Sequence, residues 1–500
     1  KKWFDLCFET SNRDEAARVF QLPNFSEKKF PYARADLLHP DYCAKSSQEE
    51  WLTVLSGIFT DNGLEPVSLL PPQAGLPLFD RLTAHANGIV KSGPLVSIVV
   101  SIWEPDEGLV TAIRSLLAQT WANIEILMVD DACAKEFRPL IERVAKMDPR
   151  IRLIRQETNM GTYMARNRAM QEARGEFITF HDADDWCHPR RIERQIQPML
   201  ENEHIMSTTS QTIRARENLL FSDLGSMTSI RLNSSSLMFR LDAVREKIGY
   251  FHASRKAADS EYIFRIQAAY GAGCRENVMD ILSIIRIGTE SLSGQDFWEG
   301  WRHPMRHQYR QSYEHWHSKI KGGNESGQLD VTDIGPISVP RRYCIGFSDQ
   351  TVKQYKVVFV ADWSGEDVAC DHMSEELAAR ATEKQSIAVL NMASPRWLSF
   401  HARDKQRAIQ SMINDKLIDE VSTMETLKAR TVVITDPAIV QYCSTERSQW
   451  LVERVYVLNR ADTTGVGTEA LYDFRTVVDN IRKICGVKPE WIENIAQIGS

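Results

Sequence analysis

Apolar runs and amphipathic stretches alternate through the middle of the chain. Runs typical of buried strands cover residues 95–100, 124–129 and 177–180, and a shorter one covers 151–154. Between the first two runs, Leu109, Ile113 and Leu116 recur at the spacing of one helix face. This alternation predicts an α/β fold with a mostly parallel sheet, in which ligands bind at the carboxyl ends of the strands.

Acidic residues follow the predicted strands. Asp130 and Asp131 end the second run, and Asp182, Asp184 and Asp185 follow the run at 177–180. Carboxylates crowded at one point repel each other unless a cation lies between them, and Mg²⁺ or Mn²⁺ holding a diphosphate fits that need. The alternative is that Asp184 or Asp185 caps a helix that starts a few residues later.

The segment from Val96 to Trp186 resembles the nucleotide-binding half of the family-2 inverting glycosyltransferases, which have the GT-A fold. The matching blocks, in the family's order, are Ser115–Thr120, Val129–Asp131, Asn159–Asn167, Ala173–Glu176 and Asp182–Trp186. The resemblance implies roles for single residues. Asp130 or Asp131 would bind the nucleotide base, Asp182 would lie near the ribose and contribute to the metal site, Asp184 would carry the metal, and Arg166 would lie near the diphosphate.

One stretch departs from the family. The first strand continues into Ser101-Ile102-Trp103-Glu104, where the family has Pro-x-Tyr-Asn. We count Glu104 among the donor-binding residues, but the base-binding edge is expected to differ from the family's. The identity of the nucleotide therefore stays open.

The catalytic base is also implied by the resemblance. Residues 257–265 lie where the family carries a Glu-Asp motif at a helix start, so Asp259 aligns with the base and Ala258 replaces the Glu. An inverting transfer needs a carboxylate that takes the acceptor hydroxyl proton, and a metal can neutralise the departing diphosphate. The alternative for Asp259 is a helix N-cap, with Glu261 in the first turn.

Aromatic and basic residues interleave between residues 296 and 317. This composition is found where a protein grips a sugar, a phosphate or a membrane surface, and also in a helix that packs its aromatics inward. In some GT-A enzymes a late histidine completes the metal shell, which makes His303 and His307 candidates. Residues 286–293 resemble the loop that closes the family's active site.

The pattern divides the chain into four parts. We expect a helical N-terminal extension over 1–93, with a helix at 51–59 on the catalytic core, then a GT-A domain over 94–320 and a linker over 321–350. Strand and helix patterns restart over 351–500 and predict a second Rossmann-like domain, loosely similar to the amino-terminal half of a GT-B glycosyltransferase. Since the chain begins with Lys and holds only one such half, we expect a piece of a longer protein.

Composition narrows the class of protein. A net charge of -7 argues against a nucleic-acid-binding protein, whose surface would be basic. Nine cysteines without a C-x-x-C pair favour reduced thiols. Without a signal peptide or a membrane-spanning apolar run, we expect a cytoplasmic protein and leave open a peripheral contact with the inner face of the membrane.

The resulting hypothesis is a metal-dependent transfer of a sugar, with inversion, from a nucleotide-sugar donor to a glycan, lipid-linked or protein acceptor, in bacterial surface polysaccharide or glycoconjugate synthesis. One alternative is a nucleotidyltransferase, which would need a glycine-rich basic loop that residues 101–106 lack. Another is a non-catalytic carbohydrate-binding or scaffold protein, favoured by Ala258. Asp182, Asp184 and Asp259 argue against the scaffold, because decay should remove clustered charges first.

Overall fold

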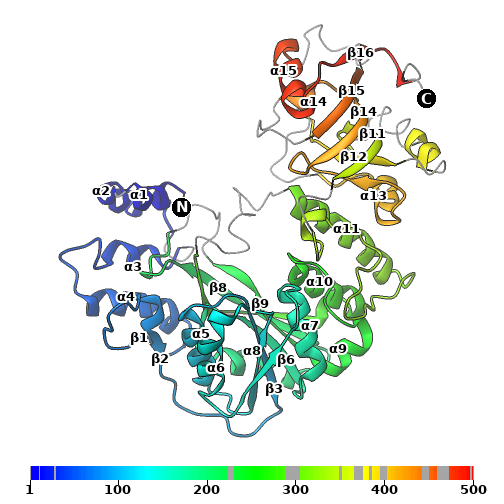
Figure 1. The fold of residues 1–500 in the computed structure, drawn as a ribbon. Coiled ribbons are helices and arrows are strands. Elements are labelled where there is room, and N and C mark those ends of the chain that lie inside the picture. Colours follow the sequence, from blue (N-terminus) through cyan, green and yellow to red (C-terminus); the bar gives the residue numbers. More distant parts are fainter. Residues whose placement is uncertain are drawn as a thin grey trace. The chain divides into compact units, whose positions relative to one another are not determined.

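The computed structural model divides the chain into two compact units (Figure 1). The first consists of Lys1–Trp301 with Ile320–Asp333, and the second of Arg302–Lys319 with Ile334–Ser500. The structure describes residues 2–10, 12–26, 30–222, 230–288, 304–347, 352–364, 375–381, 386–394, 403–441, 450–458, 472–495 and 498.

An eight-stranded sheet forms the centre of the first unit, in the order β5-β4-β3-β6-β9-β8-β10-β7. Four neighbouring strands are parallel: β3 (Val96–Ile102), β4 (Ile124–Asp130), β5 (Ile151–Arg155) and β6 (Phe177–Asp182). The remaining strands are β7 (Trp186–Cys187), β8 (Ser207–Ala215), β9 (Arg231–Arg240) and β10 (Arg275–Arg286). β9 runs antiparallel to β6 and β8, while β10 is parallel to β8 and antiparallel to β7. The prediction of a mostly parallel α/β sheet is confirmed.

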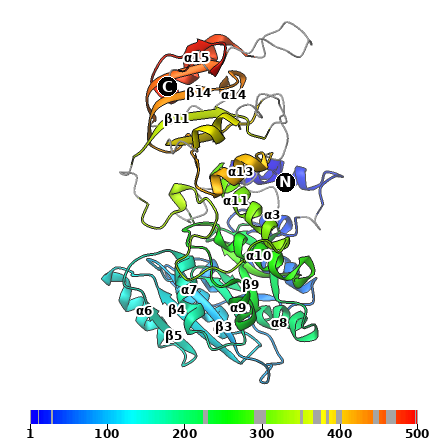
Figure 2. The same ribbon diagram turned by 90° about the vertical axis from the view of Figure 1, so that its right-hand side faces the viewer.

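Helices cover both faces of this sheet because successive strand residues point to opposite sides. Ile98 and Val100 of β3 face α5 (Gly108–Leu117), α6 (Arg138–Ala145) and α8 (Arg191–Glu201). Val99 faces α7 (Thr162–Glu172), α9 (Leu241–Ile248) and α10 (Ala258–Tyr270), which lie toward the viewer in Figure 2. Short 3-10 helices, η2 (Lys135–Phe137) and η3 (Ala272–Cys274), complete the layers.

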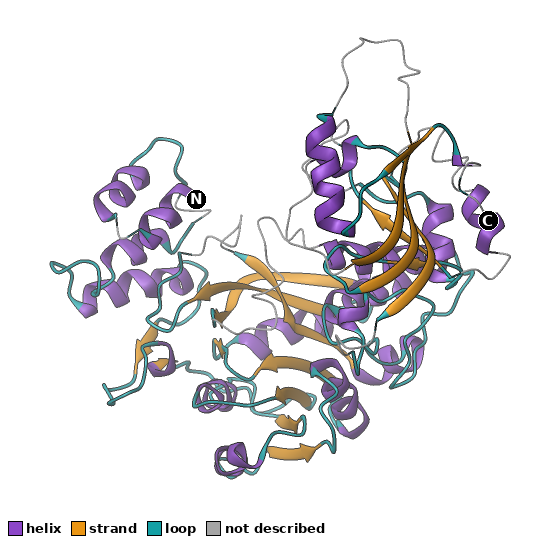
Figure 3. Ribbon diagram, turned by 45° about the horizontal axis from the view of Figure 1, so that its top comes forward, coloured by secondary structure: helices purple, strands orange, loops and turns teal. Residues whose placement is uncertain are grey.

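The N-terminal extension packs on the side chains of β7, β8 and β10, with its helices near the N label in Figure 3. Its elements are α1 (Lys2–Glu9), α2 (Arg13–Phe20), α3 (Ala33–Leu38), α4 (Gln48–Thr60), β1 (Val67–Leu69), η1 (Phe79–Arg81) and β2 (Leu82–Ala84). Ser47 caps α4 by accepting the Glu50 N–H, and the buried Phe59 ring lies 5.9 Å from that of Trp186. This contact confirms the expectation that the helix at 51–59 packs on the core.

The second unit holds an all-parallel sheet of six strands in the order β13-β12-β11-β14-β15-β16. Its strands are β11 (Lys353–Ala361), β12 (Ile387–Asn391), β13 (Asp419–Glu420), β14 (Leu427–Ile434), β15 (Trp450–Leu458) and β16 (Glu490–Ile492). Its described helices include α11 (Pro304–Lys321), η6 (Arg341–Tyr343), α13 (Arg407–Asn414), α14 (Ala438–Gln441) and α15 (Phe474–Cys485). A second α/β domain is therefore confirmed.

The boundary between the units differs from the expected one near residue 320. Helix α11 belongs mainly to the second unit, where Ser312 donates to Asn414 at 2.7 Å and the aromatics Tyr309 and Trp316 are buried. Residues 320–333, expected as a linker, pack on the first unit, since Asn167 Nδ2 donates to the Val331 carbonyl at 2.9 Å. The aromatic pattern thus marks inward packing, but within the second unit and beside α13, not on the sheet of the first unit.

The cysteines among the described residues are free thiols. None of the helices that the structure describes is long and apolar enough to cross a membrane.

Candidate active site

The carboxyl ends of β3, β4 and β6 bring the predicted acidic residues to one edge of the sheet. The strand register pairs Ile102 of β3 with Asp130 of β4, and Ser101 of β3 with Asp182 of β6. Parallel strands place their carboxyl ends together, and ligands of such sheets bind there. Asp130 and Asp182 therefore lie on either side of the end of β3.

Asp182 is held by two side chains. Arg166 of α7 donates from Nη2 to Oδ1 at 3.1 Å, and Ser235 of β9 donates to Oδ2 at 2.7 Å. The Arg166 guanidinium is itself buried, 4.9 Å from the Phe180 ring centroid. Asp182 keeps 43 % of its side chain exposed, so this fixed carboxylate still faces solvent.

Asp184 and Asp185 follow in a tight loop between β6 and β7. Asp185 is buried and accepts the Arg286 backbone N–H at 2.9 Å. Burial raises the pKa of Asp185 well above its usual range, and the charges of Asp184 and Asp182 add to the rise. Burial, and then the charge of Asp182, raise the pKa of Asp184 to about 6.

The helix-cap alternative for these acids is wrong. Helix α8 starts at Arg191, its N-cap position is Arg190, and no side chain caps it. The carboxylates of Asp184 and Asp185 therefore have no capping role there.

We call the segment Asp182–Asp185 the acidic loop. Its carboxylates fit a divalent cation. A cation close to Asp182 and Asp184 would offset the repulsion that raises the pKa of Asp184. Across the described ranges, no group of three or more His, Cys, Asp or Glu is arranged to hold a metal. A pair of carboxylates would suit Mg²⁺ or Mn²⁺ together with substrate phosphates and water.

Asp130 and Asp131 at the end of β4 are both buried. Asp131 accepts the backbone N–H groups of Met160 at 2.9 Å and Gly161 at 2.7 Å, and a bond from Gln156. It therefore shapes the loop that precedes α7. Asp130 accepts the Cys133 N–H at 2.8 Å. A role in base binding for either residue stays a prediction.

The edge after β3 is open to solvent. Trp103 and Glu104 are both exposed, and Glu104 has a left-handed backbone with φ 45°. A non-glycine residue in this region is uncommon and strained. The departure from the family's sequence therefore coincides with an unusual backbone at the expected base-binding edge.

Asp259 lies in the first turn of α10. The N-cap position is Ala257, with φ 63°, so the proposal that Asp259 is the cap is wrong. The Asp259 carboxylate accepts the Ser260 N–H at 2.7 Å and is partly exposed. Glu261 is fully buried and pairs with Arg265 at 3.0 Å, which makes it a structural residue.

A contact ties the start of α10 to the strand-end loops. Arg255 Nη2 donates to Asn159 Oδ1 at 2.8 Å, and Asn159 precedes the residues held by Asp131. The segment before Asp259 is thereby fastened to the carboxyl edge of the sheet. This is the edge at which Asp130 and Asp182 lie.

The two histidine candidates receive no support. His303 lies outside the described residues. His307 is in the second unit, where its Nε2 lies 3.3 Å from the Arg403 carbonyl oxygen. A role of either histidine in the metal site stays a prediction.

Two residues of the acidic loop's surroundings were not predicted. Arg286, at the end of β10, donates from Nε to the Asp184 carbonyl at 3.1 Å and forms a buried ion pair with Asp80 of η1. The sequence marked residues 286–293 as a closing loop without a role for Arg286. No motif around Asp80 points to a role in the site, because Asp80 is connected to it only by its contact with Arg286 in the folded chain.

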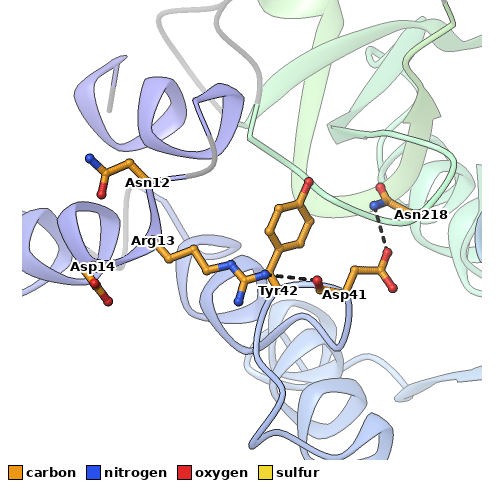
Figure 4. A pocket seen from close by; sticks show the side chains of 6 residues that line it. All are labelled: Asn12, Arg13, Asp14, Asp41, Tyr42 and Asn218. Carbon is orange, nitrogen blue, oxygen red and sulfur yellow. Dashed lines mark hydrogen bonds between the residues drawn. The ribbon is translucent and has the colours of Figure 1, made fainter.

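A cavity of 690 Å³ lies elsewhere in the first unit, in the N-terminal extension (Figure 4). It is lined by Asn12, Arg13, Asp14, Asp41, Tyr42 and Asn218. Its polar groups largely satisfy one another, since Arg13 donates to the Asp41 carbonyl at 3.0 Å and Asn218 to the Asp41 carboxylate at 3.2 Å. None of the predicted site residues lines it, so the strand-end cluster is the stronger candidate on chemical grounds.

Comparison with known proteins identifies similarity in the segment that contains these residues. Residues 97–262 match the sequence model of the family described as Glycosyl transferase family 2. This stretch runs from β3 into α10 and contains Asp182, Asp184 and Asp259. This part of the chain is similar to the family-2 glycosyltransferases.

Individual relatives cover parts of the chain. An uncharacterized glycosyltransferase of Haemophilus influenzae is 27% identical over 222 residues, which are 41% of this chain and 84% of the relative. The succinoglycan biosynthesis protein ExoO of Rhizobium meliloti is 31% identical over 155 residues, 29% of this chain and 44% of the relative. The chain thus spans less than half of ExoO.

Among solved structures, S. aureus TarS 1-349 in complex with UDP is similar with a TM-score of 0.32 and 18% identity. The match covers 39% of this chain and 60% of that one.

Proposed function

We propose that the first unit transfers a sugar from a nucleotide-sugar donor to a hydroxyl acceptor, with inversion and with a divalent metal. The observation that carries this proposal is the pair Asp182 and Asp184 at the carboxyl edge of a parallel sheet, within a family-2 segment. Clustered carboxylates with a raised pKa are costly unless a cation is bound there.

Each side chain has a task in such a transfer. Asp182, held by Arg166 and Ser235, supplies a fixed carboxylate beside the donor. Asp184 and Asp182 are the residues that would hold Mg²⁺ or Mn²⁺, whose charge would stabilise the departing nucleoside diphosphate. Asp259 takes the proton of the acceptor hydroxyl as its oxygen attacks the anomeric carbon.

The base and sugar of the donor are recognised at the exposed edge after β3. Trp103 and Glu104 are open to solvent there, and Asp130 lies at the neighbouring strand end. Because this edge differs from the family's usual sequence, the base and the sugar are left open. They are settled by testing nucleotide sugars directly.

The relatives suggest the type of product to which the acceptor belongs. ExoO is described as a succinoglycan biosynthesis protein. By analogy we place this chain in the synthesis of a bacterial surface polysaccharide or glycoconjugate, with a glycan, lipid-linked or protein acceptor. We propose a cytoplasmic location, where nucleotide sugars are made, with a peripheral membrane contact as an option.

The test is a panel of sugar nucleotides added to the whole chain with Mn²⁺ or with a chelator. A bound donor raises the unfolding midpoint by mass action. We expect one nucleotide class to do so only with the metal, and the same donor to release nucleoside diphosphate slowly. Binding without any release, with every acceptor class tested, would favour the non-catalytic scaffold instead.

A further inference from the structure

A single arginine, Arg286, forms hydrogen bonds with both Asp184 and Asp185 of the acidic loop. The Arg286 backbone N–H donates to Asp185 Oδ1 at 2.9 Å, and its Nε donates to the Asp184 carbonyl oxygen at 3.1 Å. It therefore bonds the main chain of Asp184 and does not occupy that residue's carboxylate. Its side chain is only 6% exposed, so the guanidinium charge is shielded from water.

The rest of the guanidinium is held by the N-terminal extension. Both Nη atoms of Arg286 pair with the Asp80 carboxylate, Nη1 with Oδ2 at 3.2 Å. The Phe79 ring lies flat against the same group, with its centroid 4.3 Å from Cζ. Such a two-bond fork fixes the orientation of the guanidinium as well as its position.

Asp80 is in turn fixed by the helix that follows β3. Thr111 of α5 donates to Asp80 Oδ1 at 2.7 Å, and Arg114 donates to the Asp80 carbonyl oxygen at 2.6 Å. Asp80 is buried. A chain of contacts therefore runs from α5 through Asp80 and Arg286 to the backbone of the acidic loop.

Removing Asp80 would leave the buried Arg286 guanidinium paired with Glu217, a largely exposed carboxylate 3.9 Å from Nη1. A buried charge with so distant a partner is unfavourable, so Arg286 would move toward a closer carboxylate. Asp184 is directly adjacent, since Arg286 already bonds its carbonyl. An ion pair between them would take up the carboxylate that a cation needs.

We propose that Asp80 is a positioning residue for the donor site. It holds Arg286 in the orientation that fixes the main chain at Asp184 and Asp185 and leaves the Asp184 carboxylate available to a divalent cation and a diphosphate. This inference rests on the proposed function. It assigns to the N-terminal extension, whose sequence shows no chemistry, a direct part in building the active site.

The test is cation-dependent binding of a nucleoside diphosphate by the Asp80→Asn variant. Titration calorimetry with UDP, or with GDP if the wild type does not bind UDP, is run over a series of Mn²⁺ concentrations. Residues that orient metal ligands typically account for about 10- to 100-fold in metal affinity. We expect the Mn²⁺ concentration for half-maximal binding to rise by about that factor, and Asp80→Glu to restore part of the loss.

Glu125→Gln is the matched control. Glu125 is also buried and paired, with Arg152 at 2.9 Å, but it lies at the amino end of β4, away from the site. It should reduce stability and leave the Mn²⁺ dependence unchanged. A folded Asp80→Asn variant with the Mn²⁺ dependence of the wild type would overturn the inference.

A double variant covers the case in which Asp80→Asn does not fold. Asp80→Asn with Arg286→Gln removes both charges together, which costs less than leaving one unpaired. We expect it to fold and to show a raised Mn²⁺ requirement, because the main chain at Asp184 has lost its bond from Arg286 Nε; a wild-type requirement would overturn the inference. If the wild type itself binds no nucleoside diphosphate with Mn²⁺, the proposed function fails, and that outcome is distinct from a failure of Asp80 alone.

Discussion

In the first unit, strands β4 and β6 run into Asp130 and Asp182, and in the second, β11 and β14 are followed by Asp362 and Asp436. Both sheets are parallel at these points and place an acid at the carboxyl edge. In the second unit the carboxylates of these acids stabilise loops by accepting backbone N–H groups. Asp362 accepts the backbone N–H groups of Ser364 and Ser394, and Asp436 accepts that of Ala438.

The difference lies in how many carboxylates meet and what satisfies them. Asp131 in the first unit resembles Asp362, because backbone N–H groups take up its oxygens. The loop with Asp182 and Asp184 is different, since like charges and burial raise the pKa of Asp184 to about 6. An acid at a strand end therefore indicates a site only when its charge is left unbalanced by the protein.

The largest expected effect is that of Asp184→Asn. The variant should lose Mn²⁺-dependent donor binding altogether, because it removes the proposed metal ligand. Without metal it should unfold no earlier than the wild type, because it removes a carboxylate that the charge of Asp182 repels. Calorimetry and thermal unfolding measure the two effects. Retained Mn²⁺-dependent binding would contradict the assignment.

Asp259→Asn should separate binding from chemistry. The variant should keep the donor affinity of the wild type but lose transfer by about 10²- to 10⁴-fold, the usual contribution of a general base. Kinetics with the identified donor and acceptor check this. An equal loss of donor affinity would show that Asp259 shapes the site instead.

The pH dependence of metal binding should follow Asp184. Its pKa of about 6 in the folded protein exceeds its ordinary value of 3.8, so the folded state holds a proton that the unfolded state has lost. The contribution of Asp184 to stability is thus present below about pH 4 and lost as pH rises toward about pH 6. Since a metal needs the carboxylate, Mn²⁺ affinity should fall as pH drops below about 6.

Titrations of Mn²⁺ at several pH values measure this directly. The Asp184→Asn variant is the control, because it cannot show that dependence. A Mn²⁺ affinity for the wild type that stays constant between about pH 5 and about pH 7 would rule out Asp184 as the titrating ligand.

The smallest effect is expected for Asp362→Asn in the second unit. It removes charge-assisted bonds to two backbone N–H groups and should reduce stability by about 1 kcal/mol. Donor binding by the first unit should not change. A loss of donor binding on this substitution would mean that the second unit takes part in the site.

Much of this architecture could be predicted from local pattern. The strands at 95–100, 124–129 and 177–180 follow from apolar runs, and the acids after them follow from topology. The placement of α11 could not be predicted, because the pattern of an amphipathic helix shows which face is buried but not which part of the chain covers it. Its partners, such as Asn414, lie about a hundred residues further along the chain.

Asp80 illustrates the same limit within the site. It is separated from Arg286 by 206 residues, and neither residue carries a motif that points to the other. Only the folded chain shows that Arg286 connects Asp80 of η1 with the acidic loop. Residues that bind a substrate leave patterns at strand ends, whereas residues that position them need not.

The stereochemistry of the reaction shows whether the first unit carries out a metal-dependent transfer with inversion. The whole chain is incubated with the sugar nucleotide that binds, with Mn²⁺ or with a chelator, and the anomer first formed is followed by proton NMR. From an α-linked donor we predict that nucleoside diphosphate is released only with the metal and that the sugar product forms first as the β anomer. Release of the α anomer, or equal release with the chelator, would contradict the account.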